Sequence, residues 1–224
     1  MISITAVGLK SKQEINVDVD RKKKILSAVG LAEEISAIEA QTAILQFYDD
    51  NIQSIVIDGS GNVEQGKRAE DLTPKQAEDT LTAYLRIQNN KVKALAIPVE
   101  GKGLWSTLYG YLALESDLNT VRGITFYKHG ETPGLGGEIE KEWFTSNFIG
   151  KKIFNSNGQL ASITLIKGKV DELINDAEQK SHSVDGISGA TITSRGVTAL
   201  LKKWLEEYEP FIRKTRNGSI DNLV

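Results

Sequence analysis

The chain has 224 residues, 40% of them hydrophobic, with 27 basic and 30 acidic residues and a net charge of −3. This is ordinary globular composition, and it lacks the clustered basic excess of a nucleic-acid-binding protein, so no nucleic-acid partner is expected. The absence of cysteine excludes disulfides, thiolate catalysis and Cys-ligated clusters, and with only two histidines we expect no metal site.

The region before residue 90 is expected to form a smaller, partly helical unit. Its first nine residues form a short, mostly apolar patch that fits either the end of a membrane helix or a first strand. No run of 18 apolar residues follows, so no complete transmembrane helix is predicted. Residues 10–31 have the pattern of an amphipathic helix.

Residues 32–72 have a mixed pattern, in which residues 55–57 predict a strand and residues 58–62 a turn. The pair Thr73-Pro74 predicts the start of a second helix, because proline suits the first helical position and threonine can cap the free amides. The apolar residues that follow at helical spacing are Ala77, Leu81, Tyr84 and Leu85. We therefore predict two units, residues 1–90 and residues 91–224.

After residue 90 the pattern becomes that of an antiparallel meander. Strands are predicted at residues 95–99, 108–114 and 121–127, and the turn at 117–119 joins the last two. Pro98 indicates that the first of these strands is near a sheet edge or at a strand end. The predicted fold class is α+β, with a mostly antiparallel sheet and flanking helices.

The rest of the chain combines predicted helices with one further strand and a polar stretch. Residues 163–166 predict a further strand, and residues 169–184 are polar with space for a short helix. The last helix is predicted at residues 193–208, and Pro210 is expected to end it. A helix is also predicted at 140–148, with its apolar side formed by Trp143, Phe144 and Phe148.

The segment 185–194, directly before the last helix, is the strongest candidate for a ligand site. Its small residues leave the backbone accessible, and Thr191, Thr193 and Ser194 supply hydroxyl groups. Free amides at a helix N-terminus carry positive dipole character, which favours a phosphate. An ordinary helix cap after a glycine turn would have the same location. The full pattern, Asp-x-x-Ser-Gly-Ala-Thr-x-Thr, favours the ligand site, because it resembles the pattern that flavin transferases recognise in their targets.

Two further stretches suit a flat aromatic ligand. Residues 130–137 contain four glycines and predict either a surface turn or a wall for a flat ring, with Leu135 as an apolar lid. They do not form the Gly-x-Gly-x-x-Gly pattern of a dinucleotide site. In residues 101–107, Trp105 suits either a core position or stacking on a ring.

These stretches, in this order, resemble the C subunit of the sodium-translocating NADH:quinone oxidoreductases. The similarity extends over essentially the whole chain and is strongest at residues 101–150 and 184–197. It implies an electron carrier that is not catalytic alone, with the A, B, D, E and F subunits as partners and a flavin transferase for maturation. It also implies a bacterial inner-membrane complex, with this domain on the periplasmic side and a single membrane helix before residue 1.

Carried onto this sequence, the resemblance implies an FMN joined through its phosphate to Thr193. The residues implied around the phosphate are Ser188, Gly189, Ala190 and Thr191. The residues implied along the flavin are Trp105, Ser106, Glu131, Thr132, Gly134 and Leu135, with Lys169 as a further contact.

Three other interpretations compete with this one. The G subunit of the Rnf electron-transport complex shares the threonine-linked flavin, although residues 103–111 and 126–131 favour the quinone reductase. A module that binds a phosphorylated ligand reversibly near Thr193 would be colourless after washing. A purely structural protein with an empty site would not need the threonine for electron transfer.

Overall fold

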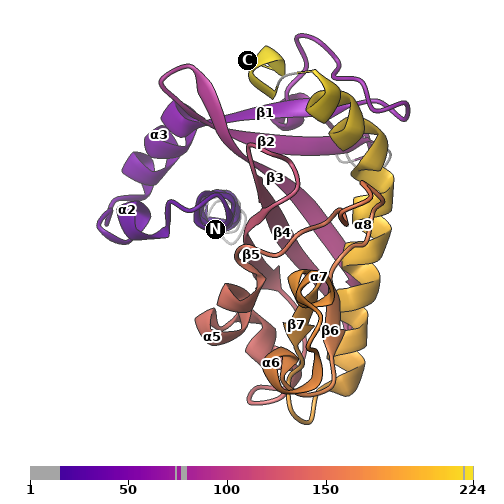
Figure 1. Ribbon diagram of the computed structural model, residues 1–224. Coiled ribbons are helices and arrows are strands. Elements are labelled where there is room, and N and C mark those ends of the chain that lie inside the picture. The colour runs from indigo at the N-terminus through magenta and orange to yellow at the C-terminus, as the bar shows by residue number, and fades with distance from the viewer. Residues whose placement is uncertain (1–15, 74, 77–79, 219, 224) are drawn as a thin grey trace, which may run out of the picture.

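The computed structural model describes residues 16–73, 75–76, 80–218 and 220–223. Its centre is a five-stranded sheet with the order β1-β2-β3-β4-β5, in which every neighbouring pair is antiparallel (Figure 1). The strands are β1 (Ile52–Ile57), β2 (Leu81–Gln88), β3 (Lys91–Lys102), β4 (Thr107–Glu115) and β5 (Val121–Lys128). The predicted α+β class with a mostly antiparallel sheet is confirmed.

Helices cover both faces of this sheet (Figure 1). Leu95 and Ile97 of β3 pack in the same core as α8 (Thr191–Asn217), whereas Ala94 and Ala96 pack in the core of the N-terminal helices. Successive strand residues point to opposite faces, so the central strands are buried on both sides. Their sequences are therefore almost continuously apolar.

The N-terminal layer contains a helix at residues 16–28, followed by α2 (Ala32–Ser36) and α3 (Gln41–Asn51). The first of these confirms the predicted helix over residues 16–28, and it ends three residues before the predicted end at residue 31. The apolar start of the chain lies outside the described residues. Among the residues that are described, no helix is both long and apolar enough to cross a membrane.

A small α/β unit follows β5 and leads to α8. Its elements are η2 (Gly136–Glu140), α5 (Glu142–Thr145), η3 (Ser146–Phe148), β6 (Thr164–Ile166), α6 (Val170–Leu173), α7 (Ala177–Ser181) and β7 (Ser183–Asp185). Strands β6 and β7 pair in parallel. The helix predicted at 140–148 is broken into short pieces, in which Phe144 and Phe148 are buried but Trp143 is 47% exposed. Two 3-10 turns lie elsewhere, η1 (Ala69–Asp71) and η4 (Ile220–Leu223).

The predicted helix through Leu81, Tyr84 and Leu85 is wrong, because these residues form β2; Pro74 and Ala77 lie outside the described residues. Leu85 and Tyr84 pack in cores on opposite faces of the sheet. Because β2 is buried on both faces, its sequence lacks the alternation of polar and apolar residues that identifies a strand. The spacing of its apolar residues instead matches that of a helix.

The turn between β2 and β3 carries the local signal that would have predicted this hairpin. Asn89 and Asn90 both have positive φ, 53° and 56°, and the flanking Gln88 and Lys91 are paired. Two such residues make the primed turn that matches the twist of a hairpin, and asparagine tolerates this conformation. The boundary predicted near residue 90 coincides with this turn, and β2 and β3 pair on either side of it.

Pro98 lies in the central strand at the point where that strand loses one neighbour. The pairing of β3 with β2 ends at Ala96 and Tyr84, whereas Pro98 is still in register with Tyr111 of β4. A proline cannot donate to a sheet ladder, so its location beyond the last β2 pair leaves no ladder bond unmade on that side. The prediction of a strand end at Pro98 is therefore correct for the pairing of β3 with β2 but not for its pairing with β4.

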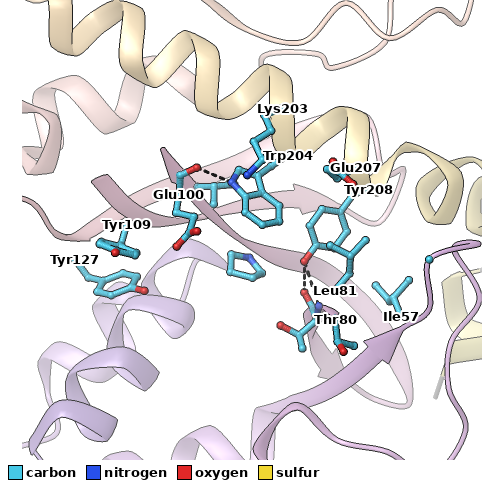
Figure 2. Close-up of a pocket in the computed structure, with 14 residues that line it drawn as sticks. Ile57, Thr80, Leu81, Glu100, Tyr109, Tyr127, Lys203, Trp204, Glu207 and Tyr208 are labelled. Carbon is cyan, nitrogen blue, oxygen red and sulfur yellow. Dashed lines mark hydrogen bonds between the residues drawn. The ribbon is translucent and has the colours of Figure 1, made fainter. Parts of the chain in front are cut away.

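Two aromatic side chains of α8 bind the backbone where the sheet parts (Figure 2). The Tyr208 hydroxyl donates to the Thr82 carbonyl oxygen at 2.6 Å and lies 3.3 Å from the amide nitrogen of the same residue. One turn earlier, Trp204 Nε1 donates to the Glu100 carbonyl oxygen at 2.7 Å. These contacts fix the long helix against the ends of β2 and β3, and thereby position its N-terminus.

Pro210 does not end α8, which continues to Asn217. An internal proline costs about 3 kcal/mol, because it removes a helical hydrogen bond and crowds the preceding turn. Phe211 and Ile212 are fully buried after it, and Lys214 Nζ donates to two oxygens of the 58–62 turn at 2.7 Å. Packing of the last two turns offsets the cost of the proline.

Candidate functional site

The predicted attachment residue, Thr193, is the third residue of α8 and is 1% exposed. Its hydroxyl donates a hydrogen bond to Oε2 of Glu131. The Glu131 carboxylate, itself buried, also accepts hydrogen bonds from the amides of Leu104 and Trp105 at 3.2 and 2.9 Å. One carboxylate therefore joins three segments that are far apart in the sequence: the start of α8, the glycine-rich loop and the β3–β4 turn.

The environment of Glu131 favours its ionised form. Burial alone would raise the pKa of this carboxyl group. The hydrogen bonds from Thr193 and from the amides of Trp105, Leu104 and Ser106 outweigh burial and lower the pKa below its ordinary value. The group is consequently a carboxylate at neutral pH.

Glycine is required where the loop 130–137 meets α8. A Cβ atom on Gly136 would lie 2.5 Å from Thr193 Oγ1 and 2.8 Å from Glu131 Oε2. Gly189 has a φ of +74°, and a Cβ there would lie 2.8 Å from Leu135 Cδ2. The two predicted stretches thus pack directly on each other, and the absence of side chains permits the approach.

The N-terminus of α8 has free hydrogen-bond donors. Its first helical bond runs from the Ser194 amide to the Ala190 carbonyl oxygen at 2.9 Å, and no side chain caps the helix. The amides of Thr191, Ile192 and Thr193 make no hydrogen bond to any residue in the described part of the chain. Such amides, at the positive end of a 27-residue helix, favour an anion.

A basic cleft of about 540 Å³ lies beside this helix terminus. Its lining includes Lys167, Lys169 and Arg195, and no acidic side chain is among the residues that line it. Three residues of the predicted phosphate loop also line it: Ser188, Gly189 and Thr191. Ala190 is buried as the N-cap, and Thr193 faces Glu131 and not the cleft.

Asp185, the first residue of the predicted motif, connects the loop before α6 to the cleft. Its carboxylate accepts hydrogen bonds from Lys169 Nζ at 2.9 Å and from the Val170 amide at 2.8 Å. Burial alone would raise the pKa of Asp185, but the Val170 amide and the Lys169 ammonium lower it. The ionised aspartate therefore holds Lys169 at the cleft.

The side chains predicted along a flavin are mostly at the surface. Trp105 is 70% exposed, which excludes the core position considered for it, and Leu135 is 43% exposed. The Ser106 hydroxyl accepts a hydrogen bond from the Gly130 amide at 2.5 Å and so joins the β3–β4 turn to the glycine-rich loop. The Thr132 carbonyl oxygen closes that loop by accepting from the amides of Leu135 and Gly137, and Gly134 has a φ of +74° within it.

Sequence reasoning missed four residues near this site: Leu104, Lys167, Ile192 and Arg195. Leu104 and Ile192 are large apolar side chains that are 41% and 54% exposed, and the two basic residues line the cleft. Arg195 carried a usable signal, because a basic residue in the first turns of a helix opposes the helix dipole unless an anion is near.

A second cleft, of about 590 Å³, lies between α8 and the parted strands (Figure 2). Its lining includes Tyr109, Tyr127, Trp204 and Tyr208. It contains none of the residues predicted to contact a flavin, so the site described above does not extend into it.

The FMN-binding domain family model matches residues 103–206, a range that contains every predicted site residue. The C subunit of the Na(+)-translocating NADH-quinone reductase of Vibrio anguillarum is 36% identical, over 99% of this chain and 91% of that protein. The chain belongs to this C-subunit family. The family member from Pseudomonas aeruginosa is 37% identical, over 95% of this chain and 88% of that protein. The crystal structure of the Parabacteroides distasonis family member matches with a TM-score of 0.75 and 32% identity, over 91% of this chain and 96% of that one.

Proposed function

We propose that this chain is the electron-carrying C subunit of a sodium-pumping NADH:quinone oxidoreductase and that it carries FMN joined through its phosphate to Thr193. The observation that supports this most directly is the location of Thr193 in the first turn of α8, where the first three amides make no hydrogen bond to any described residue. A phosphodiester keeps one negative charge, which these amides and the helix dipole stabilise.

The residues present fit an FMN. Lys169 and Arg195 line the adjoining cleft and would compensate the phosphate charge, while Gly136 and Gly189 leave space for a close approach. The exposed indole of Trp105 would stack on a flat ring. The flavin, when bound, would supply the electron chemistry, and the protein would supply position and electrostatics. A covalent link would retain the group while part of it stays exposed to partner proteins.

The proposed partners are those that the resemblance implies. The A, B, D, E and F subunits would be its partners: electrons from NADH would reach this chain through iron–sulfur chemistry in partner subunits and pass to a threonine-linked flavin of the B subunit. The complex would lie in a bacterial inner membrane, with this domain on the periplasmic side. A flavin transferase would attach the FMN. The three relatives are all C subunits of the quinone reductase, which supports this assignment over the G subunit of an Rnf complex.

The test is the intact mass of the chain coexpressed with a flavin transferase. We expect a gain of about 440 Da, corresponding to FMN joined with loss of water. Thr193→Val should abolish the gain, and Thr191→Val, which removes the neighbouring exposed hydroxyl, should retain it. An unmodified parent beside an active transferase would contradict the covalent link and favour reversible binding or an empty scaffold. Restored NADH:quinone activity in a strain lacking the C subunit would distinguish the quinone reductase from an Rnf complex.

A further inference from the structure

The contact between Glu131 and Thr193 has a chemical direction. The threonine hydroxyl is the donor and the carboxylate the acceptor, so the proton that must leave Oγ1 already points at a base. Both residues are buried, at 5% and 1% exposure, so bulk water competes little for this proton.

Backbone amides hold the carboxylate in place. Leu104 and Trp105 donate to its two oxygens, and no Lys, Arg or His side chain forms an ion pair with it among the described residues. These amides keep the carboxylate ionised and also lower its basicity, so its suitability as a base comes from its position: an acceptor oxygen without a counter-charge lies against the Thr193 hydroxyl.

Gly136 leaves the space in which the Thr193 hydroxyl and the Glu131 carboxylate are in contact. Any side chain at position 136 would lie in the space of Thr193 Oγ1 and Glu131 Oε2. A simple helix cap would not need this arrangement, because the threonine hydroxyl binds no backbone amide of its own helix. The hydroxyl is therefore oriented toward the carboxylate and not toward the helix.

We propose that Glu131 is the general base for covalent attachment of the flavin to this chain. In the step, Thr193 Oγ1 attacks the riboflavin-bearing phosphorus of a flavin adenine dinucleotide presented by the transferase. The Oγ1–P bond forms, the P–O bond to AMP breaks, and AMP leaves with the electron pair. The proton of the hydroxyl passes to Glu131, and no electron is transferred. The inference rests on the proposed attachment at Thr193.

The experiment measures the initial rate of covalent flavin incorporation with purified transferase and flavin adenine dinucleotide, followed by in-gel fluorescence and intact mass. Removal of a general base costs roughly 10²–10⁴-fold. We expect Glu131→Gln to reduce kcat at least about 100-fold, with KM for the acceptor protein little changed. Glu142→Gln is the matched control, because it also removes one negative charge but at an exposed position on α5, and it should leave the rate unchanged.

A comparison of two substitutions separates chemistry from shape. Glutamine preserves the size of Glu131 but not its basicity, whereas aspartate preserves the carboxylate but is shorter. We expect Glu131→Asp to be labelled faster than Glu131→Gln, with both variants folded by circular dichroism. Labelling of Glu131→Gln at the parent rate or faster, or faster than Glu131→Asp, would overturn the proposal. If the parent takes no label beside an active transferase, the proposed attachment at Thr193 is wrong. If the parent is labelled and Thr193→Val is not, the attachment stands, and the rates of the Glu131 variants test the role of Glu131 alone.

Discussion

Tyr208→Phe tests whether the hydrogen bonds between Tyr208 and Thr82 stabilise the packing of α8 where β2 and β3 separate. The substitution removes one hydroxyl from a fully buried ring and leaves the packing of the ring intact. It deprives the Thr82 carbonyl oxygen of its 2.6 Å bond and the Thr82 amide of its 3.3 Å bond. Pro98, beyond the last paired residue of β3 on the β2 side, has no N–H with which to replace the lost donor.

The magnitude follows from these two groups. A buried polar group left unpaired costs about 1–3 kcal/mol, and the longer contact to the amide contributes the smaller part. We therefore expect the free energy of unfolding to fall by about 2–3 kcal/mol. For a chain of this size, that loss would lower Tm by roughly 4–12 °C.

Urea denaturation followed by circular dichroism measures the effect, with an unchanged m-value as the sign of an unchanged unfolded state. Tyr109→Phe is the matched control. Tyr109 lines the same cleft, but its hydroxyl has no hydrogen bond to a described residue, so the loss should stay within about 0.5 kcal/mol. An equally small loss for Tyr208→Phe would refute the reasoning, since it would mean that water from the cleft satisfies Thr82.

Three further predictions concern the site and the hairpin. Gly136→Ala should lower the free energy of unfolding by about 1–3 kcal/mol and slow flavin attachment, because its Cβ would displace the Thr193 hydroxyl; urea melts and the labelling assay measure both. The stability difference between the parent and Glu131→Gln should shrink in acid. The folded-state pKa of Glu131 is lowered, so its contribution is complete above the ordinary pKa of 4.5 and is lost as the pH falls through the folded-state value; urea midpoints from pH 7 to 3 test this. Asn90→Val should cost roughly 1–2 kcal/mol in urea melts, because a β-branched residue is strained at a φ of 56°.

Each of these has a control in the chain. Gly59→Ala should be neutral, because nothing lies within 4 Å of its Cβ position. Glu142→Gln, which changes one exposed carboxylate to an amide, is the matched control for the acid series and should stay within about 0.5 kcal/mol of the parent at pH 7. Asn90→Gly should be at least as stable as the parent, since glycine adopts positive φ without strain. Equal effects in a variant and its control would show that the named contact is not the cause.

Local patterns were sufficient for the meander from β3 to β5. The apolar runs at 95–99, 108–114 and 121–127 are separated by short turns, and antiparallel neighbours joined by short turns pair with each other. The motif at 185–193 was equally local, because a phosphate site at a helix N-terminus depends on consecutive residues.

Other elements depended on burial that no local pattern expresses. Leu81, Tyr84 and Leu85 have helical spacing, but β2 lies between β1 and β3 with both faces covered, and this overrides the local preference. Likewise, Pro210 predicts a helix end, yet α8 continues because its last turns pack on the 58–62 turn.

The sequence by itself determined the class of the fold, the family and the threonine at the start of α8. Tertiary structure alone decided that Glu131, 62 residues earlier in the chain, accepts a hydrogen bond from that threonine hydroxyl. It also decided that Lys167, Lys169 and Arg195 line one cleft. Helix and turn patterns act over a few residues, whereas contacts between distant segments depend on how the sheet and α8 pack, and no spacing in the sequence encodes that distance.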